Sequence, residues 1–198
     1  ESGGASGMDN SPRFDQPIGG AADLNSFVAT DMLYPAQVAR ALGLDDEATQ
    51  WMERRGELSH RINERLWDDA TGFYYDLDAE GRIARLKTEA GFAPLFAGIC
   101  SPEQADALVG HLTSPSEFWR PFPVASVSAD ESTYSDDMWR GPVWVNYNYM
   151  IIEGLRSYGY QDIAESLRMA TLTEIARWYE RDGVIYEFYD AEGTRSPS

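Results

Sequence analysis

The most informative segment of this chain reads Asp137-Met138-Trp139-Arg140-Gly141-Pro142-Val143-Trp144-Val145-Asn146-Tyr147-Asn148-Tyr149-Met150. It begins an apolar segment, residues 139–158, which predicts a helix buried on nearly every side, with Pro142 in its first turn. The start of this helix offers flat aromatic faces, amide groups and one guanidinium. These groups suit a sugar ring, which is apolar on its faces and hydroxylated around its rim. An ordinary core helix with internally satisfied polar groups explains the segment equally well.

Two kinds of helical segment alternate along the chain on either side of this region. Residues 22–42, 88–99 and 139–158 are mostly apolar, whereas residues 45–67, 102–112 and 161–179 are amphipathic. This alternation is expected when an inner ring of helices is wrapped by an outer ring, so we predict an all-α fold. We expect Gly43 and Gly159 to end two inner helices in the left-handed conformation, and Pro35 to kink or break the first inner helix.

Short strands and long loops are predicted between the helices. Residues 72–78 and 183–189 are predicted strands, each closed by a turn, at residues 78–81 and 190–193. Residues 1–21 and 113–135 are predicted loops, and loops of this length in a compact domain are usually functional. Residues 76–81 faintly resemble a calcium-binding loop, but the twelve-residue pattern is not completed. We therefore predict a plain turn there, and no metal.

Composition and charge exclude several classes of partner. The chain has 198 residues, 43% of them hydrophobic, and a formal net charge of -17. This charge argues against nucleic acid and against anionic membrane surfaces, which both need positive patches. No apolar run reaches the roughly 18 residues of a membrane-spanning helix, and Cys100 is the single cysteine, so no intramolecular disulfide is expected. We predict no cofactor and a cytoplasmic location.

Two carboxylates are placed where the chemistry of sugar hydrolysis would need them. Hydrolysis uses one carboxylic acid to protonate the leaving oxygen and a second carboxylate to activate water or to attack directly. Asp9 lies just before the first inner helix, and Glu187 lies just after the last outer helix. In a ring of hairpins the loops that lead into inner helices open on one face, so the two residues can meet across one cavity. Taken singly, Asp9 is better explained as an Asx-turn residue and Glu187 as a solvated strand residue.

Three motifs stand out in the chain: Asp9-Asn10-Ser11-Pro12-Arg13, Trp139-Arg140-Gly141-Pro142-Val143-Trp144-Val145-Asn146 and Tyr186-Glu187-Phe188-Tyr189-Asp190. They resemble the motifs of glycoside hydrolase family 63, and in particular of its mannosylglycerate-hydrolase-like members. The similarity runs in order over essentially the whole chain. It implies an (α/α)6 barrel, with short β-hairpins in the loops, that hydrolyses glycosides with inversion of anomeric configuration.

The same resemblance implies roles for individual residues. Asp9 matches the general acid of the family and Glu187 matches its general base. Trp139, Arg140 and Trp144 fall where the family lines its sugar subsite, and Asn10 and Tyr189 are further predicted substrate contacts. The implied substrate is an α-glucoside or α-mannoside of the oligosaccharide, mannosylglycerate or glucosylglycerate type.

The chain departs from the family pattern in two ways. Gly4-Ala5-Ser6 follows the Glu1-Ser2-Gly3 that would normally adjoin the aspartate motif, which leaves the register of Glu1 open. A barrel of this type has six hairpins, whereas three are predicted here. We therefore interpret residues 1–198 as the C-terminal part of one catalytic domain, with the remainder missing. In an isolated piece of this kind, the faces of inner helices that would otherwise pack against the missing helices should be exposed.

Other interpretations remain open on the sequence alone. Arg140 is as well explained by an ion pair with Asp136 or Asp137 as by a contact with sugar. A phosphorylase on the same scaffold would need a basic cluster, and an epimerase would need histidines, of which His60 and His111 are better explained as surface or interlayer residues. A non-catalytic sugar-binding or interaction module would keep the aromatic residues without needing Asp9 and Glu187 to converge.

Overall fold

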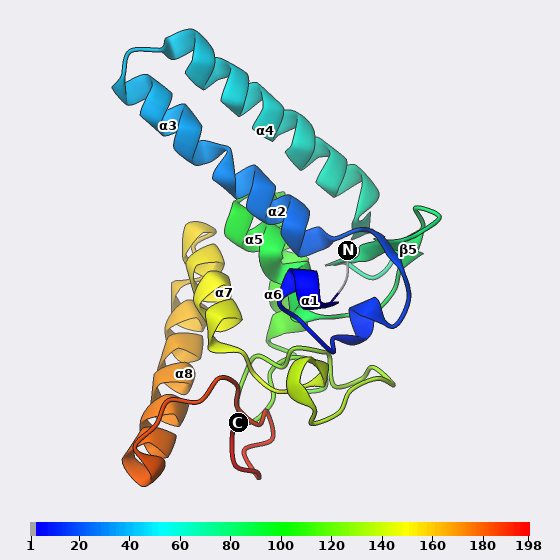
Figure 1. Cartoon of the computed structure of the whole chain (residues 1–198), viewed down its shortest axis with the longest axis vertical. Helices are drawn as coiled ribbons and strands as arrows, with labels where there is room; N and C mark the ends of the chain where they lie inside the picture. The colour runs from blue at the N-terminus through cyan, green and yellow to red at the C-terminus, as the bar shows by residue number, and fades with distance from the viewer. Residues whose placement is uncertain (1–2) are drawn as a thin grey trace.

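A computed structural model describes residues 3–198, and Figure 1 shows its elements in order. The prediction about the register of Glu1 lies outside the described residues. The helices are α1 (Gly3–Ser6), α2 (Ala22–Asp31), α3 (Leu33–Ala41), α4 (Asp45–Arg65), α5 (Ala93–Ala97), α6 (Pro102–Leu112), α7 (Val145–Ser157) and α8 (Gln161–Asp182). Short 3-10 helices are η1 (Pro12–Phe14), η2 (Glu89–Phe92) and η3 (Met138–Arg140). The strands are β1 (Ile18–Gly20), β2 (Trp67–Asp68), β3 (Phe73–Tyr74), β4 (Asp76–Asp78) and β5 (Ile83–Ala84).

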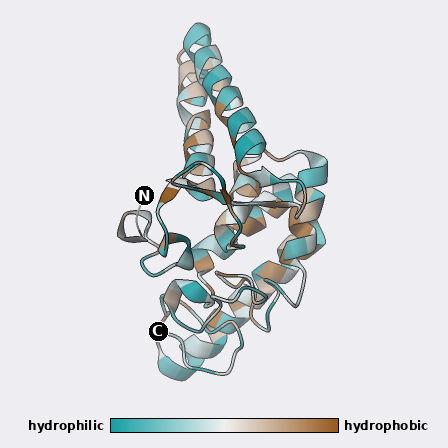
Figure 2. Ribbon diagram, turned by 90° about the vertical axis from the view of Figure 1, so that its right-hand side faces the viewer, coloured by the Kyte–Doolittle hydropathy of each residue, from teal (hydrophilic) through white to brown (hydrophobic). Residues whose placement is uncertain are grey.

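The helices form an inner and an outer set. Helix α5 packs against both α2 and α7, while α4 covers α2 and α3, and α8 covers α7. Helix α6 contacts β3 and contributes Ala105, Leu108 and Leu112 to the main core. Figure 2 shows hydrophobic residues gathered in the body of the molecule, below the more hydrophilic arm that α3 and α4 form. The predicted all-α alternation of inner and outer helices, a partial (α/α)6 toroid with short strands in its loops, is confirmed.

The first inner segment breaks as the sequence predicted. Helix α2 ends at Asp31 and α3 begins at Leu33, with Met32 between them. Pro35 explains the break, because it has no N–H to donate to the carbonyl of Asp31 one turn earlier. Gly43 and Gly159, with φ of 73° and 88°, follow α3 and α7 in the left-handed conformation, as expected.

One face of this segment is exposed and apolar. Leu24 and Val28 are four residues apart on α2, and Val38 and Leu42 are four apart along α3, so each pair lies on one side of its helix. Their exposed fractions run from 40% to 69%. The predicted exposure of inner-helix faces is therefore confirmed.

The start of the third inner helix differs from the prediction. Helix α7 begins at Val145, so Pro142 lies before the helix and not in its first turn. The preceding residues are held in another conformation by contacts distant in sequence, since Val143 exchanges two backbone hydrogen bonds with Tyr189, at 2.7 and 3.0 Å. Gly141 packs so closely on the backbone that a Cβ there would lie 2.0 Å from the carbonyl oxygen of Ser135.

The short strands are only partly as predicted. Residues 72–78 form β3 and β4, which pair with β2 and with β1 and β5 respectively. The strand predicted over residues 183–189 is wrong, because only Tyr189 pairs, in an isolated bridge to Val143. The backbone N–H groups of Glu187 and Phe188 both donate to the carbonyl of Ser198, so they do not pair with a neighbouring strand. The turns predicted at residues 78–81 and 190–193 are confirmed by hydrogen bonds from Gly81 to Asp78 and from Gly193 to Asp190.

Candidate active site

The loop that carries Asp9 joins α1 to η1 and leaves the Asp9 side chain exposed. The next residue, Asn10, is tied to the segment before α7. Its amide oxygen accepts from the backbone N–H of Trp139 at 2.9 Å, and its amide nitrogen donates to the carbonyl and the carboxylate of Asp137 at 3.2 and 2.9 Å. Both ends of the Asn10 amide are thus used within the protein, which favours a positioning role over the predicted contact with substrate.

Arg13 anchors the same loop in the core. Its guanidinium donates to both carboxylate oxygens of Asp23, at 2.6 and 2.8 Å, and to both of Asp76, at 2.7 and 3.0 Å. Burial alone would raise the pKa of Asp23, but the hydrogen bonds and charge of Arg13 outweigh burial and lower it. The hydroxyl of Tyr147, from α7, also donates to Asp23 at 3.2 Å. Asp23 is a site residue that the sequence reasoning missed, although one acid inside an apolar segment was a usable signal.

Trp139 and Trp144 form a stacked pair, with ring centroids 3.6 Å apart and planes within 5°. They are only 5% and 6% exposed, so most of each ring is covered in this structure. The indole N–H of Trp144 donates to the carbonyl of Met138 at 3.0 Å. The pair is therefore a rigid platform to which neighbouring segments attach.

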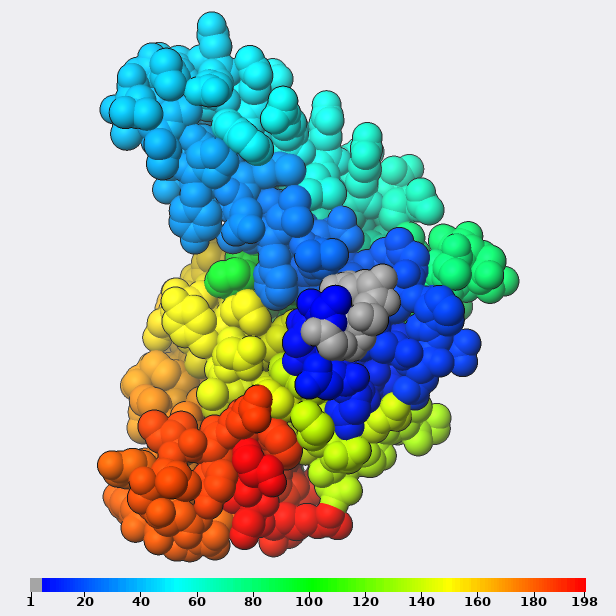
Figure 3. Space-filling view, in the orientation of Figure 1, coloured from blue at the N-terminus to red at the C-terminus, as the bar shows by residue number. Residues whose placement is uncertain are grey.

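The segment that carries Glu187 attaches to the other end of this platform. The ring of Phe188 lies 5.1 Å from that of Trp144, and Tyr189 pairs with Val143. Glu187 is exposed, whereas Tyr189 is fully buried against Phe122. The predicted contact between Tyr189 and a substrate therefore finds no exposed atom in this structure. Figure 3 shows the N-terminal segment in dark blue, the start of α7 in yellow and the C-terminal segment in red on one face of the molecule.

A cavity of about 650 Å³ lies between helices α2, α5 and α7 and the residues just before Asp9. Its lining includes Gly7 and Met8, which precede Asp9, together with Trp139 and Asn146. The other lining residues are Ser6, Phe27, Phe96, Tyr147, Tyr149 and Met150. An apolar hollow with a few polar groups at its edge is the usual form of a small-molecule site.

Arg140 extends from η3 back toward the Asp9 loop. Its guanidinium donates to the carboxylate of Asp15 at 2.5 Å, and the ion pair is partly exposed. The partner is thus Asp15, and not Asp136 or Asp137 as the alternative interpretation predicted. Through this pair and the Asn10 amide, the loop of residues 9–15 is fastened to η3 at both of its ends.

Glu89, at the start of η2, is an acid that the sequence reasoning did not single out. It is fully buried, and among residues 3–198 neither of its carboxylate oxygens has a hydrogen-bond partner. Burial raises its pKa well above the usual value, the charge of Arg13 opposes that rise, and the charge of Asp23 adds to it. The acidity of Glu89 is therefore set by its burial and by the charges of Arg13 and Asp23. A charged residue that opens an apolar segment was the only signal in the sequence.

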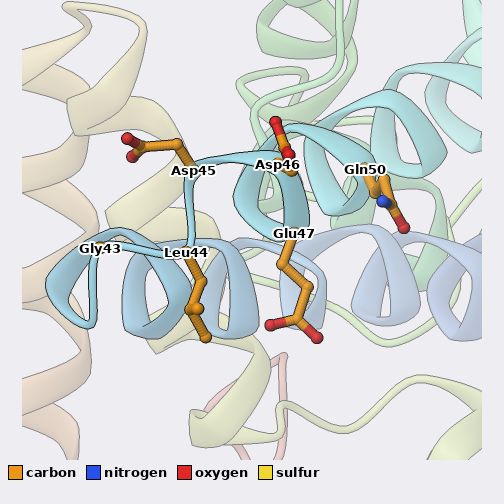
Figure 4. Close-up of a pocket in the computed structure, with 6 residues that line it drawn as sticks. All are labelled: Gly43, Leu44, Asp45, Asp46, Glu47 and Gln50. Carbon is orange, nitrogen blue, oxygen red and sulfur yellow. The ribbon is translucent and has the colours of Figure 1, made fainter.

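Other parts of the described chain are weaker candidates for a functional site. A second cavity, of about 560 Å³, lies at the turn between α3 and α4, where Figure 4 shows the side chains of Asp45, Asp46 and Glu47 pointing in different directions. Within residues 3–198 no group of three or more His, Cys, Asp or Glu is placed to hold a metal. None of the helices in that range is both long and apolar enough to span a bilayer.

The histidines lie where the sequence predicted. His60 is exposed on α4. His111, on α6, contacts a carboxylate oxygen of Glu117 at 2.6 Å and the carbonyl of Thr71 at 2.8 Å. Neither residue belongs to the elements that surround Asp9.

Comparison with known proteins identifies the family of this chain. The family model described as the mannosylglycerate hydrolase MGH1-like glycoside hydrolase domain matches residues 3–194. The chain belongs to this family. It is 37% identical over 149 residues to a mannosylglycerate hydrolase of Thermus thermophilus, in a match that covers 73% of this chain and 33% of that protein. It is 33% identical over 160 residues to a mannosylglycerate hydrolase of Rubrobacter radiotolerans, in a match that covers 78% of this chain and 35% of that protein.

The fold is shared with a solved structure of the same family. The crystal structure of the family 63 mannosylglycerate hydrolase from Thermus thermophilus, in complex with Tris, superposes with a TM-score of 0.75 and 29% identity, covering 89% of this chain and 41% of that one. The resemblance to glycoside hydrolase family 63 is therefore confirmed. The chain spans about a third of the length of the curated relatives it matches.

Proposed function

We propose that this chain supplies the two catalytic carboxyl groups of an inverting glycoside hydrolase that cleaves an α-mannosidic or α-glucosidic bond. The observation that carries the proposal is the shared attachment of two distant segments. Asn10, next to Asp9, is bonded to Trp139, while Phe188, next to Glu187, packs on Trp144, and the two tryptophans are stacked. Family membership supports hydrolysis as the reaction, and two relatives named mannosylglycerate hydrolases favour a glycoside of a small hydroxy acid.

The mechanism assigns a separate proton transfer to each carboxyl group. Protonated Asp9 gives its proton to the glycosidic oxygen as the bond from that oxygen to the anomeric carbon breaks. Ionised Glu187 takes a proton from a water molecule that attacks the anomeric carbon from the opposite face. Inversion needs the two carboxyl groups roughly 6.5–9.5 Å apart, which leaves space for that water.

The test is made on the full-length protein that contains this chain. Asp9→Asn and Glu187→Gln should each lower kcat by about 10²–10⁴-fold, with the circular dichroism spectrum unchanged. Asp162→Asn, at an exposed acid in the first turn of α8, is the matched control and should keep full activity. The substrates are a panel of α-mannosides and α-glucosides, including mannosylglycerate and glucosylglycerate, with the first product anomer identified by NMR. Near-normal kinetics in either variant would remove that residue from the mechanism, and a retained anomer would exclude inversion.

The competing functions are less well supported by the site. Phosphorolysis needs a free cationic pocket, whereas Arg140 is paired with Asp15 and Arg13 is buried between two carboxylates. Epimerisation through histidine is not favoured by the positions of His60 and His111. A sugar-binding module without chemistry would bind members of the same panel and turn none of them over.

A further inference from the structure

The Asp9 carboxyl is not oriented by contacts of its own. Within residues 3–198, no hydrogen bond or ion pair to the Asp9 side chain is formed, and the side chain is exposed. A general acid must nevertheless meet the leaving oxygen within hydrogen-bond distance, about 2.6–3.2 Å between heavy atoms. Its placement therefore depends on how firmly the backbone of its loop is held.

The first restraint on that backbone is Asn10. The three hydrogen bonds of its amide reach a segment 127 to 129 residues away, and they use the oxygen as acceptor and the nitrogen as donor. An amide bonded at both ends fixes the distance and the rotation between the Asp9 loop and the stacked tryptophans. Asp9 and the stacked tryptophans are thus held in a fixed relative position.

The second restraint is Arg13, four residues after Asp9. Its side chain is only 1% exposed and binds Asp23 on α2 and Asp76 on β4 in a bidentate manner. Asp76 also accepts from the backbone N–H of Ala22 at 2.9 Å, which joins α2 to the same cluster. A buried ion cluster of this kind is weak evidence for stability, because removing the charges from water offsets much of their attraction. The bidentate geometry of the cluster is better explained by a role in positioning the Asp9 loop.

We propose that Asn10 and Arg13 are positioning residues for Asp9, which hold its carboxyl where it can protonate the leaving oxygen. This inference rests on the proposed function, and it assigns to Asn10 a role different from the substrate contact that the family resemblance implied. Neither residue touches the reacting atoms. Their substitution displaces the acid and leaves the attack of water, assisted by Glu187, in place.

Two substrates with different leaving groups separate positioning from general damage to the fold. The aglycone of a glyceryl glycoside would be a poor leaving group as an alkoxide, so it needs the proton of Asp9 and leaves as an alcohol. The aglycone of a dinitrophenyl glycoside of the same sugar leaves as a phenolate without that proton. In the full-length enzyme, Asn10→Ala and Arg13→Lys should lower kcat for the glyceryl glycoside by about 10- to 100-fold, since a displacement of the order of 1 Å has that effect. For the dinitrophenyl glycoside kcat should stay close to that of the parent, and KM should change little for both.

Control variants set the scale of this test. Asp9→Asn should show the same dependence on the leaving group, and more strongly. Arg85→Lys replaces an arginine whose side chain is 60% exposed and paired with Asp68, and it should affect neither substrate. If Arg13→Lys does not fold, Asn10→Ala carries the test, because its amide lies nearer the surface.

The outcomes distinguish the inference from the proposed function. Equal losses on both substrates, or no loss on either, would overturn the positioning role while the parent enzyme remains an active glycosidase. A parent enzyme that hydrolyses neither substrate nor any other glycoside of the panel would overturn the proposed function, and the inference with it.

Discussion

Replacing Glu89 by glutamine should change how the stability of the protein depends on pH. Glu89 is fully buried and has no hydrogen-bond partner in the described part of the chain, and burial raises its pKa well above the ordinary glutamate value of 4.5. An acid whose folded-state pKa is raised stabilises the fold fully below its unfolded pKa, and this stability is lost as pH rises toward the folded pKa. In that window the folded state holds one proton more than the unfolded state. The free energy of unfolding therefore falls by about 1.4 kcal/mol for each pH unit.

Glutamine has nearly the same shape and cannot ionise, so Glu89→Gln removes this term. The unfolding free energy of Glu89→Gln minus that of the parent should grow by about 1.4 kcal/mol for each pH unit above 4.5, until the folded pKa is reached. Urea unfolding of the full-length protein at intervals of about one pH unit, from about pH 5 to pH 8, measures this difference. Glu57→Gln, at an exposed acid on α4, is the control and should run parallel to the parent. A difference between Glu89→Gln and the parent that does not change with pH would refute the reasoning.

Three further predictions concern packing, capping and charge. Gly154→Ala should destabilise the fold by about 1–3 kcal/mol, because the added Cβ would lie 2.9 Å from the backbone nitrogen of Phe96. Gly56→Ala, on α4, should instead stabilise the fold by about 0.5–1 kcal/mol, because the added Cβ would meet open space. Thermal unfolding of the pair checks both, and a shift of the same sign in each would contradict the packing argument. Ser101→Ala should lose about 1 kcal/mol, because Ser101 forms a capping box with Gln104 at the start of α6; an unchanged melting temperature would argue against it. Arg140→Lys should raise KM for the proposed sugar substrate, because an ammonium group cannot reproduce the planar guanidinium with its five hydrogen-bond donors. An unchanged KM would show that Arg140 serves only in its ion pair with Asp15.

Elements stabilised by local interactions were predictable from the sequence. Amphipathic periodicity located α4, α6 and α8 within a few residues, and Pro35 predicted the break between α2 and α3. The two elements that were wrong depend on each other. The α-helix predicted from residue 139 begins only at Val145, and residues 183–188 do not form a strand, because Val143 pairs with Tyr189 and Glu187 bonds to Ser198. Pairing over such distances in sequence leaves no periodic pattern in either segment.

The candidate site, like the fold, was predictable only where the sequence carries a local signal. The three motifs identified the segments that carry Asp9, the tryptophans and Glu187, and the structure joins them through Asn10 and Phe188. The partners of Arg13 and Arg140 were not predictable, since each carboxylate comes from an element whose position depends on the whole fold. The burial of Glu89 is likewise a property of the assembled core.

The segment from Asp137 to Trp144 is attached to the Asp9 loop at one end and to the Glu187 segment at the other. A substitution within it, for example at Gly141, is therefore expected to disturb the proposed acid, Asp9, and the proposed base, Glu187, together. Paired with Asn10→Ala, such a change should show epistasis, with a combined loss that differs from the product of the separate losses. Laboratory evolution of substrate preference would then find this segment accessible only through compensating double replacements.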